Sequence, residues 1–399
     1  MNNKFPPEWT EINVEDAFEI GRGRVINKTE IKLNQGIYPV YSSQSSNYGR
    51  FGYLNTYDFD GEYITWTTDG AYAGSVFYRK GKFNCTNVCG TLKDAGTHKI
   101  DLCFIAYYLS TVAKNHVSYV GNPKLMNNTF AKIKILLPKL AEQKKIASIL
   151  TSVDEVIEKT QSQINKLQDL KKGTMNELLT KGIGHTEFKD SKLGKIPNNW
   201  DIQKLGDLCE IRGRIGWKGY AVADLRNEGA LVIGATQINK NHEIDLSKPK
   251  YISDKKYEES PEIMIQPNDI ILVKTGNTIG KLALVSNDIG RATINPNTVI
   301  LRSKSNFHEF IYFVLTWSVY QSKFWDLVAV GAQPSLNQEN IKNILLSLPN
   351  QDEMKIINKT LKKHINLINN LKIKKDKLQL LKKSLMQDLL TGKVRVSVN

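Results

Sequence analysis

Two short segments of the chain place arginines beside glycines. Gly21-Arg22-Gly23-Arg24 lies near the start of the chain, and Arg212-Gly213-Arg214 lies in its second half. A glycine lets the backbone approach a partner closely, and a guanidinium group binds phosphate oxygens. Both segments therefore favour contacts with a phosphate backbone, and arginines in solvated loops are the alternative.

Two polar loops contain side chains that can read nucleic-acid bases. They are "SSQSSNYGR", which contains Gln44, Asn47 and Arg50, and "GATQINKN", which contains Gln237 and Asn239. Asparagine and glutamine can form paired hydrogen bonds with adenine, and arginine can do so with guanine. Polar loops also occur without this purpose, so the residue types alone leave both interpretations open.

The charge of the chain fits a polyanionic partner. Its 55 lysines and arginines exceed its 40 acidic residues, which gives a net charge of +15 and a pI near 9.4. Such a balance favours nucleic acid over a small neutral ligand. Basic proteins without nucleic-acid function are common, so the charge supports the interpretation of the loops but does not decide it.

Catalytic motifs are missing from the sequence. We find no Asn/Asp-Pro-Pro-Tyr/Phe motif of amino-methyltransferases, no complete phosphate-binding loop and no nucleophile paired with a base. The segment Gly276-Asn-Thr-Ile-Gly280-Lys281-Leu282 is one residue shorter than a Walker A motif and has Leu282 where Ser or Thr must bind magnesium. We therefore expect a turn between two strands there, and no catalytic residue in the chain.

The four cysteines do not predict a metal site or a disulfide framework. Cys85, Cys89, Cys103 and Cys209 form no CxxC pair, and Cys85-x3-Cys89 followed by His98 lacks the spacing of a structural zinc site. We expect buried free thiols and no metal. Free thiols, together with the lack of a long apolar run or a signal peptide, favour a cytoplasmic protein.

An internal repeat organises the elements that must position these loops. "LKKGTMNELLTKG" at 170–182 and "LKKSLMQDLLTGK" at 381–393 match at a spacing of 211, as do Pro138 and Pro349. The beginnings of the two copies match at a spacing of 191, which places Trp9 in register with Trp200. The middle segments, at about 21–120 and 212–331, differ in sequence, and their different lengths account for the difference between the two spacings. The sequence thus predicts two copies of one frame around two different centres.

Each copy ends in a predicted long helix of about 40 residues, roughly 60 Å in length. Steps of three and four residues separate its apolar positions, which favours an antiparallel coiled coil formed by the two helices. Lys375 and Lys382 interrupt the second stripe, so we expect imperfect packing or outside contacts there. The stripes contain Ile146, Ile149, Val153, Val156, Thr160, Ile164, Leu167, Lys171, Thr174 and Leu178, and then Leu361, His364, Ile368, Leu371, Lys375, Leu378, Lys382, Leu385 and Leu389.

The centres read as α+β domains. Alternating apolar and polar residues at 74–78 and 269–274 predict short strands, and the stretches 101–114 and 307–325 predict helices. The two domains and two long helices are related by a pseudo-two-fold axis in the expected arrangement. The predicted parts are domain 1 at 1–138, helix 1 at 139–182, a linker at 183–196, domain 2 at 197–349 and helix 2 at 350–392.

This order of segments resembles the specificity subunit of type I restriction-modification systems. The resemblance covers essentially the whole chain and rests on "LPKLAEQKKIASIL" at 137–150 and on the junction "LLTKGIGHTEFKDSKLGKIPNNW" at 178–200. The first centre contains "TTDGAYAGSVFYRKGKF" and the second contains "ILVKTGNTIGKLALV", and both look like target recognition domains of that family.

The resemblance implies a bipartite DNA site, with one half read by each target recognition domain. The helices of the family space the domains and dock methyltransferase subunits, two of them in the expected complex, which bind S-adenosylmethionine and methylate adenine. Restriction subunits translocate and cut DNA, so this chain itself would bind no cofactor. One departure is "LPNQDEMKII", which lacks the Glu-Gln-Lys run at 142–144 of the first copy because Met354 stands where the first copy has Gln143. The second helix would then dock its methyltransferase less tightly.

On this resemblance, candidate residues fall into two sets. The DNA-binding set is Arg22, Arg24, Gln44, Asn47, Tyr48, Arg50, Thr68, Tyr72, Lys124, Arg212, Arg214, Lys218, Gln237, Asn239, Lys274, Thr275, Asn277, Lys281 and Gln333. The set for subunit docking and helix pairing is Gln143, Ile146, Ile149, Val153, Ile164, Leu167, Leu178, Leu361, Ile368, Leu371, Leu378, Leu385 and Leu389.

Two other classes of protein remain open at this point. A coiled-coil transcription regulator would explain the basic charge and the helices, but it would normally repeat identical readers. A duplicated scaffold or ligand-binding protein would bind no duplex specifically. Co-purification with a methyltransferase separates both classes from the family named above.

Overall fold

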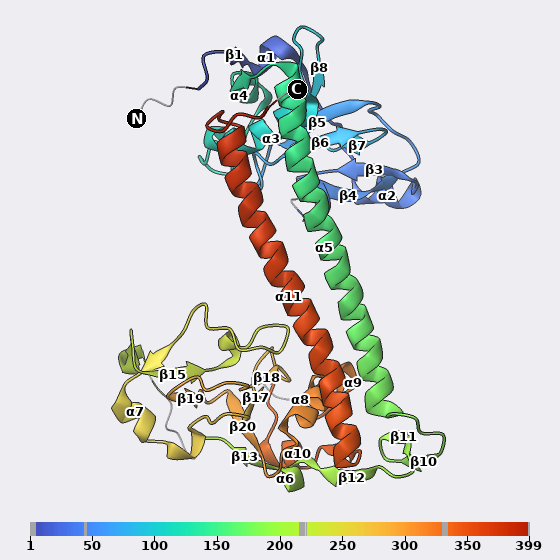
Figure 1. Cartoon of the computed structure of the whole chain (residues 1–399), viewed down its shortest axis with the longest axis vertical. Helices are drawn as coiled ribbons and strands as arrows, with labels where there is room; N and C mark the ends of the chain where they lie inside the picture. The colour runs from blue at the N-terminus through green and yellow to red at the C-terminus, as the bar shows by residue number, and fades with distance from the viewer. Residues whose placement is uncertain (1–4, 44–45, 215–219, 221, 329–333, 398–399) are drawn as a thin grey trace. The chain divides into compact units, whose positions relative to one another are not determined.

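The computed structural model describes residues 5–43, 46–214, 220, 222–328 and 334–397 (Figure 1). The chain divides into two compact units. Unit 1 contains Met1–Ser162 together with Leu371–Asn399, and unit 2 contains Gln163–Asn370. The long helices α5 (Leu140–Thr180) and α11 (Gln351–Leu389) each begin in one unit and end in the other. Unit 1 is therefore built from both ends of the sequence.

Unit 1 contains a four-stranded antiparallel sheet with helix α3 packed on it, and a small second sheet in which β3 pairs in parallel with β7. A third pairing joins β1 to β9 directly before α5. The helices and strands of unit 1 that precede α5 are β1 (Thr10–Asn13), α1 (Val14–Ala17), β2 (Phe18–Arg22), α2 (Lys28–Leu33), β3 (Tyr38–Tyr41), β4 (Arg50–Leu54), β5 (Glu62–Thr67), β6 (Val76–Lys80), β7 (Asn84–Cys85), β8 (Cys89–Asp94), α3 (Leu102–Val112), α4 (Asn127–Ala131) and β9 (Lys134–Leu137).

Unit 2 repeats this plan with the large sheet in the order β13-β20-β17-β18, matching β2-β8-β5-β6 of unit 1. Its elements are β10 (Phe188–Ser191), β11 (Gly194–Pro197), β12 (Asp201–Lys204), α6 (Leu205–Leu208), β13 (Cys209–Arg212), β14 (Leu225–Arg226), β15 (Ala230–Ile233), β16 (Tyr251–Ile252), α7 (Asp254–Glu258), β17 (Ile270–Val273), β18 (Leu282–Leu284), β19 (Ala292–Ile294), β20 (Thr298–Ser303), α8 (His308–Thr316), α9 (Ser318–Asp326), α10 (Gln338–Lys342) and β21 (Leu345–Leu348). The predicted α+β class with an internal repeat is confirmed.

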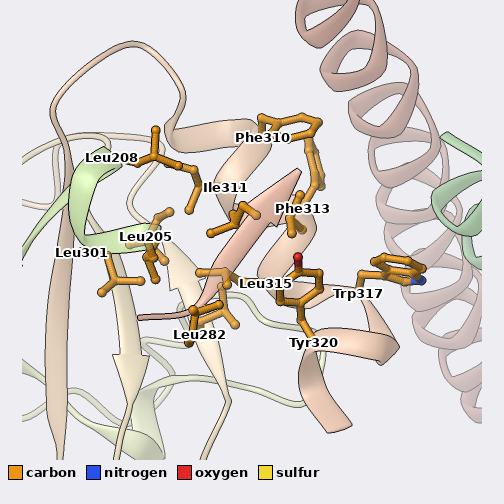
Figure 2. Packing of buried hydrophobic residues seen from close by; sticks show 14 of the residues in the cluster. Leu205, Leu208, Leu282, Leu301, Phe310, Ile311, Phe313, Leu315, Trp317 and Tyr320 are labelled. Carbon is orange, nitrogen blue, oxygen red and sulfur yellow. The ribbon is translucent and has the colours of Figure 1, made fainter. Parts of the chain in front are cut away.

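The core of unit 2 forms where α8 lies on the large sheet (Figure 2). Apolar residues at helical spacing, Phe310, Phe313 and Val314, face leucines of the strands, including Leu282 and Leu301. Burial of such a side chain contributes about 1.5–3 kcal/mol. The equivalent helix α3 is buried in the same way in unit 1, so the two units share a packing scheme as well as a topology.

Three expectations for local structure differ from the observed elements. The helix predicted at 307–325 is two helices, because Trp317 has an extended backbone (φ −68°, ψ 139°) that separates α8 from α9. The helix predicted at 101–114 ends at Val112 and continues as a 3-10 turn. The segment 183–196, predicted as a linker, contains β10 and most of β11, which pair as a hairpin. For the two helical stretches the pattern predicted a helix but not its interruption, and in the linker it missed the hairpin.

Within unit 1, the first part of α5 lies antiparallel to the last part of α11. Lys375 donates a hydrogen bond to Gln161 Oε1 (2.9 Å), and Lys382 forms an ion pair with Asp154 (2.7 Å). Both lysines therefore have partners within the unit, and the expectation of imperfect packing or outside contacts there stays a prediction. They are half-buried and bind polar partners on the facing helix, and Lys382 also lies over the ring of Tyr107.

The stripe residues lie on the covered faces of both helices. Among the candidate pairing residues, none is exposed: Ile146, Ile164, Leu361, Ile368 and Leu389 are buried, and Ile149, Val153, Leu167, Leu178, Leu371, Leu378 and Leu385 are half-buried. Val156 is the exception within the predicted stripe, because its side chain is 39% exposed. Within unit 2, burial and then the charge of Lys171 lower the pKa of His364.

Each long helix ends on the tryptophan that opens the unit in which it ends. After α5, Gly182 has φ +65° and lies against Trp200, and after α11, Gly392 has φ +71° and lies against Trp9. A left-handed conformation after a helix favours glycine. An added Cβ would also collide with the Trp200 ring at Gly182 and with Pro6 at Gly392. The glycine stops predicted for both helices thus also provide close packing.

A buried glutamate at the start of each long helix fixes this junction. Glu353 accepts hydrogen bonds from Trp200 Nε1 (3.1 Å) and from the backbone N–H of Ile183 (2.8 Å), and it pairs with His185. Glu142, its equivalent at the spacing of 211, instead pairs with Arg395 at 2.7 and 2.9 Å. The same helix position therefore holds a different partner in each unit.

We expect Glu353→Ala to destabilise unit 2 by about 3 kcal/mol, because it leaves several buried donors without an acceptor. Glu142→Ala is the matched control and should cost about 1 kcal/mol, because Arg395 is partly exposed and water can replace its partner. Urea unfolding, followed by hydrogen exchange read separately for each unit, measures the difference. Equal losses for the two variants would contradict the assigned role of Glu353.

Candidate nucleic-acid interface

Two loops meet at one end of the large sheet in each unit. In unit 1, the glycine turn 70–74 between β5 and β6 meets the proline loop 123–125: the Gly70 N–H bonds to Pro123 O (2.9 Å), and the Leu125 N–H bonds to Thr68 O (2.8 Å). In unit 2, the glycine turn 276–280 and the proline loop 334–336 make the same two bonds: Gly276 N–H to Pro334 O (3.0 Å) and Leu336 N–H to Lys274 O (2.8 Å). The strand before each turn orients the loops.

Both glycine turns need glycine at the same two positions. Gly70 and Gly74 have φ of +92° and +80°, and Gly276 and Gly280 have +92° and +86°. Residues with a Cβ rarely adopt this backbone, so the matching glycines fix one turn shape in both units. The turn predicted between two strands at 276–282 is confirmed, since β17 precedes it and β18 follows it.

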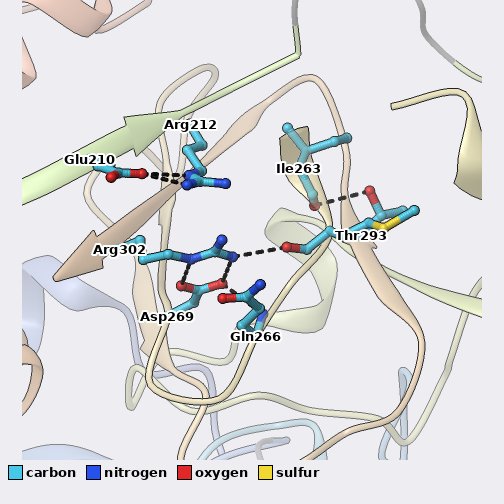
Figure 3. A network of polar contacts seen from close by, with 8 residues as sticks. Glu210, Arg212, Ile263, Gln266, Asp269, Thr293 and Arg302 are labelled. Atoms are coloured by element: carbon cyan, nitrogen blue, oxygen red, sulfur yellow. Dashed lines mark hydrogen bonds and ion pairs between the residues drawn. The ribbon is translucent and has the colours of Figure 1, made fainter. Parts of the chain in front are cut away.

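A polar network supports the turn of unit 2 from the opposite end of the strand (Figure 3). Arg302 of β20 forms a two-point ion pair with Asp269 (2.7 and 2.8 Å), and Asp269 also accepts from the Gln266 N–H (2.7 Å). Asp269 is buried and directly precedes β17. A carboxylate with three donors is well satisfied there, so the network holds β17 against β20.

The family of this chain can be stated from these repeated features and from comparison with known proteins. The model of the type I restriction modification DNA specificity domain matches residues 6–169 and, a second time, residues 197–380. The chain belongs to this family. The two matches start 191 residues apart and end 211 apart, which are the spacings of the internal repeat.

Two relatives named as specificity subunits differ in how much of the chain they match. The MjaVIII specificity subunit of Methanocaldococcus jannaschii is 26% identical over 98% of this chain and 94% of its own length. A putative type I specificity subunit of Mycoplasma pneumoniae is 44% identical, over 39% of this chain and 42% of its own length. The prediction of two target recognition domains in a type I specificity subunit is confirmed by these matches.

A solved structure shows the same fold. The S subunit of a type I restriction-modification system from M. genitalium has a TM-score of 0.65 at 15% identity, over 98% of this chain and 97% of that one. At this identity the likeness concerns the fold alone. In the described part of the chain, no helix is both long enough and apolar enough to cross a membrane.

The arginines of the two specificity domains are engaged within their own units. Arg22 binds Asp69 (3.2 Å) and Thr68 Oγ1 (2.9 Å), and Arg24 pairs with Glu30 and Asp58. In unit 2, Arg212 pairs with Glu210, and Arg214 donates to Ser260 Oγ (3.3 Å). Arg22, Arg24 and Arg212 are thus paired with carboxylates of their own units, which weakens the prediction that these three side chains are the main phosphate contacts.

The glycines beside these arginines serve internal packing. A side chain at Gly23 would collide with the carbonyl oxygens of Cys85 and Thr86, and one at Gly213 would collide with Gln338. Arg24 forms a parallel bridge with Thr86 at this point. Gly23 is therefore required by backbone packing inside unit 1, whereas the Gln338 side chain could move away from a residue larger than Gly213. The expectation that these glycines let the backbone approach an external partner stays a prediction.

Two candidate base readers of unit 2 form hydrogen bonds within their own unit. Gln237 is 3% exposed, donates to Lys248 O (3.2 Å) and accepts from Thr236 Oγ1 (2.9 Å). Asn239 accepts from the backbone N–H groups of Asn241 and Glu243 and thereby shapes its own turn. The burial of Gln237 speaks against a base contact by this residue. Asn239 is half-buried, and its base contact stays a prediction.

Other candidate residues differ widely in exposure. Asn47, Tyr48, Tyr72, Lys124 and Asn277 are exposed, whereas Arg50, Lys274, Thr275 and Lys281 are half-buried, and Thr68 is buried. Gln143, a candidate for subunit docking, is also buried: it donates to Lys99 O and Pro138 O and accepts from the Asp101 N–H, so it cannot dock a partner directly. Gln44, Lys218 and Gln333 lie outside the described residues.

Sequence reasoning missed the most exposed residues of the interface. Ser118 and Lys124 exchange backbone hydrogen bonds (2.8 and 2.9 Å), so residues 119–123 form a hairpin tip beside the glycine turn. At this tip, Tyr119 and Val120 are exposed, with Val120 at 92%. Exposed aromatic and aliphatic side chains can contact bases and thymine methyl groups. The signal in the sequence was an apolar pair inside the polar segment "SYVGNPK".

The cysteines lie away from any such chemistry. All four are free, Cys85, Cys89 and Cys209 are buried as expected, and Cys103 is half-buried. Burial raises the pKa of the Cys89 thiol to about 11, so these groups stay protonated at neutral pH. Among the described residues, no group of three or more His, Cys, Asp or Glu could hold a metal ion.

Proposed function

We propose that the chain reads the two halves of a bipartite DNA site, one half with each unit, as the specificity subunit of a type I restriction-modification complex. The observation that carries the proposal is the pair of glycine turns and proline loops, which have the same backbone bonds but different exposed side chains. Lys124, Tyr119 and Val120 border one turn, and Asn277 lies in the other. One frame with two different surfaces suits two different half-sites better than a regulator with identical readers.

We propose further that the chemistry belongs to partner subunits. Two modification subunits would bind S-adenosylmethionine and methylate adenine, restriction subunits would join them, and this chain would be non-catalytic and bind no cofactor. Because Gln143 is bonded within unit 1, docking would use other residues. Co-purification of the chain with a methyltransferase, and mapping of methylated adenines in cells with and without its gene, test the proposal. Loss of the gene should abolish methylation at one two-part sequence.

Salt dependence identifies the residues that contact phosphate. Because Arg22 and Arg24 are ion-paired, we expect the exposed Lys124 beside the glycine turn to contribute more. Lys124→Ala should reduce the slope of log affinity against log salt by about 0.9, the value for one phosphate contact. Lys80→Ala is the control: this lysine is also exposed but pairs with Glu62 on the large sheet, and its loss should leave the slope unchanged. Equal slopes for wild type and Lys124→Ala would place the contact elsewhere.

A further inference from the structure

The turn Ser46–Gly49 between β3 and β4 of unit 1 has an unusual backbone. Asn47 and Tyr48 have φ of +51° and +55°, and Gly49 follows at +79°. The left-handed region costs an ordinary residue roughly 1–2 kcal/mol, less for asparagine than for tyrosine. A turn that only reverses the chain would be more stable with glycine at 47 and 48, as it has at 49. Strain of this kind persists where the side chains are needed.

A buried arginine holds this turn from below. Arg79 of β6 is 6% exposed and donates to Tyr48 O (2.8 Å) and Thr65 Oγ1 (3.1 Å). Its guanidinium stacks on the rings of Tyr41 (3.5 Å) and Phe77 (4.5 Å). These partners are neutral, and burial lowers the pKa of Arg79 to about 10. Burying a charged group without a charged partner is costly, and the hydrogen bonds of Arg79 to the turn and to Thr65 offset part of this cost.

A carboxylate on the long helix holds the same turn from the side. The Tyr48 hydroxyl donates to Glu158 of α5, and burial together with this bond raises the pKa of Tyr48 to about 12. Asp154, one turn earlier on α5, accepts from the Tyr107 hydroxyl (2.7 Å) and pairs with Lys382. Arg79 and Glu158 therefore fix Tyr48 by its carbonyl and by its hydroxyl.

The result of this double attachment is the placement of Asn47. Its neighbour is fixed at both ends, its own side chain is exposed, and its left-handed backbone turns the side chain to a direction that a regular turn would not give. A side-chain amide is the group that pairs with the N6 and N7 atoms of adenine. The pair requires a defined direction of approach, which a mobile side chain on a loose loop would lack.

We propose that Asn47 reads an adenine-containing base pair in the half-site of unit 1, and that Arg79 and Glu158 are positioning residues that hold it through Tyr48. This inference rests on the proposed function, because it assigns a specificity-determining residue to one of the two proposed readers. Tyr48 itself offers the face of its ring, which is exposed in part (55% for the residue), while its hydroxyl stays on Glu158.

Asn47→Gly separates a reading role from a structural one. Glycine relieves the left-handed strain, so the variant should melt at the same temperature as wild type or higher. It also removes the amide, so discrimination at one base pair of the half-site of unit 1 should fall about tenfold or more, and the half-site of unit 2 should be unchanged. A residue that only shapes the turn would show the stability gain without the change in preference.

The positioning residues are tested by conservative variants. Arg79→Lys keeps the charge but cannot stack and donate as the guanidinium does, and Tyr48→Phe removes only the hydroxyl. Both should relax the same base pair by about threefold, an order-of-magnitude expectation for a loosened hydrogen-bonded group. A third variant, Glu158→Gln, removes the charge of the carboxylate that accepts from the Tyr48 hydroxyl. Glu155→Gln is its matched control, because Glu155 lies one turn away on α5 and pairs only with Lys159 among the ion pairs described for it.

The measurement uses the full chain with its co-purified methyltransferase subunits. A pool of duplexes with randomised sequence is captured, sequenced and compared between variants, and thermal melting is recorded in parallel. If wild type enriches a two-part sequence and Asn47→Gly enriches the same one with equal stringency, the inference is wrong and the proposed function stands. If wild type enriches no sequence, the proposed function is wrong as well.

Discussion

Exchange of residues 21–120 for the corresponding segment of another member of the family should change one half of the recognised DNA sequence and leave the other half as it was. The segment contains the end of β2 and strands β5, β6 and β8 of the large sheet, the turn at 46–49 and the first glycine turn. Unit 2, at 163–370, has its own core and its own loops, so its contacts do not depend on the exchanged residues. Mapping of methylated sites for the chimera with its partner subunits measures both halves at once.

The reciprocal exchange of residues 212–331 is the control for this experiment. It should alter only the other half-site, and the two chimeras together assign each half-site to a unit. A chimera that remains active but changes both halves would show that the units do not read independently. The exchange should change the whole sequence of one half-site, so its expected effect is larger than that of any single substitution considered above.

The length of the long helices should set the number of unread base pairs between the half-sites. From the sequence alone, four residues inserted near Gln161 of α5 would be expected to lengthen the spacer. The structure adds a condition, because Gln161 accepts from Lys375 and Asp154 pairs with Lys382 on the facing helix. We therefore expect an insertion in α5 alone to break this register, and a paired insertion of four residues after Gln161 and four before Lys375 to preserve it.

The paired insertion adds about 6 Å to each helix and turns it only about 40° beyond a full rotation. At 3.4 Å per base pair, the spacer should lengthen by about one to two base pairs while both half-sites stay the same. A paired insertion of two residues is the control, because a rotation of about 200° turns the covered stripe outward and should abolish assembly. An active four-residue variant with an unaltered spacer would show that the partner subunits, and not these helices, separate the readers.

The frame of this protein was predictable from its sequence because each element carries its signal locally. Glycine and proline mark the glycine turns and proline loops, three-and-four spacing marks α5 and α11, and the repeat shows each of them twice. The sequence also showed that Gly276–Lys281 is not a Walker A motif, because the segment is one residue too short and lacks the hydroxyl that binds magnesium. Local signals of this kind do not depend on which segments meet.

The details of the interface were not predictable, because they depend on which groups meet across the fold. Gln237 and Asn47 lie in similar polar loops, yet one is buried by Lys248 and Thr236 while the other is exposed on a strained turn. The burial of Arg79 could not be predicted, since a single arginine in a strand pattern normally faces solvent. Lys382 looked like a defect in an apolar stripe until Asp154 of the facing helix was placed beside it.

The last residues of the chain complete the first unit, and this has a consequence during synthesis. Leu389 and Leu390 belong to the core that also contains Trp9 and Phe104, whereas unit 2 is one continuous stretch that ends at Asn370. On the ribosome, unit 2 can close as soon as its own sequence has emerged, but unit 1 must wait with an open apolar surface for residues 371–397. A premature stop near residue 385 should therefore damage the domain encoded first and spare the one encoded second.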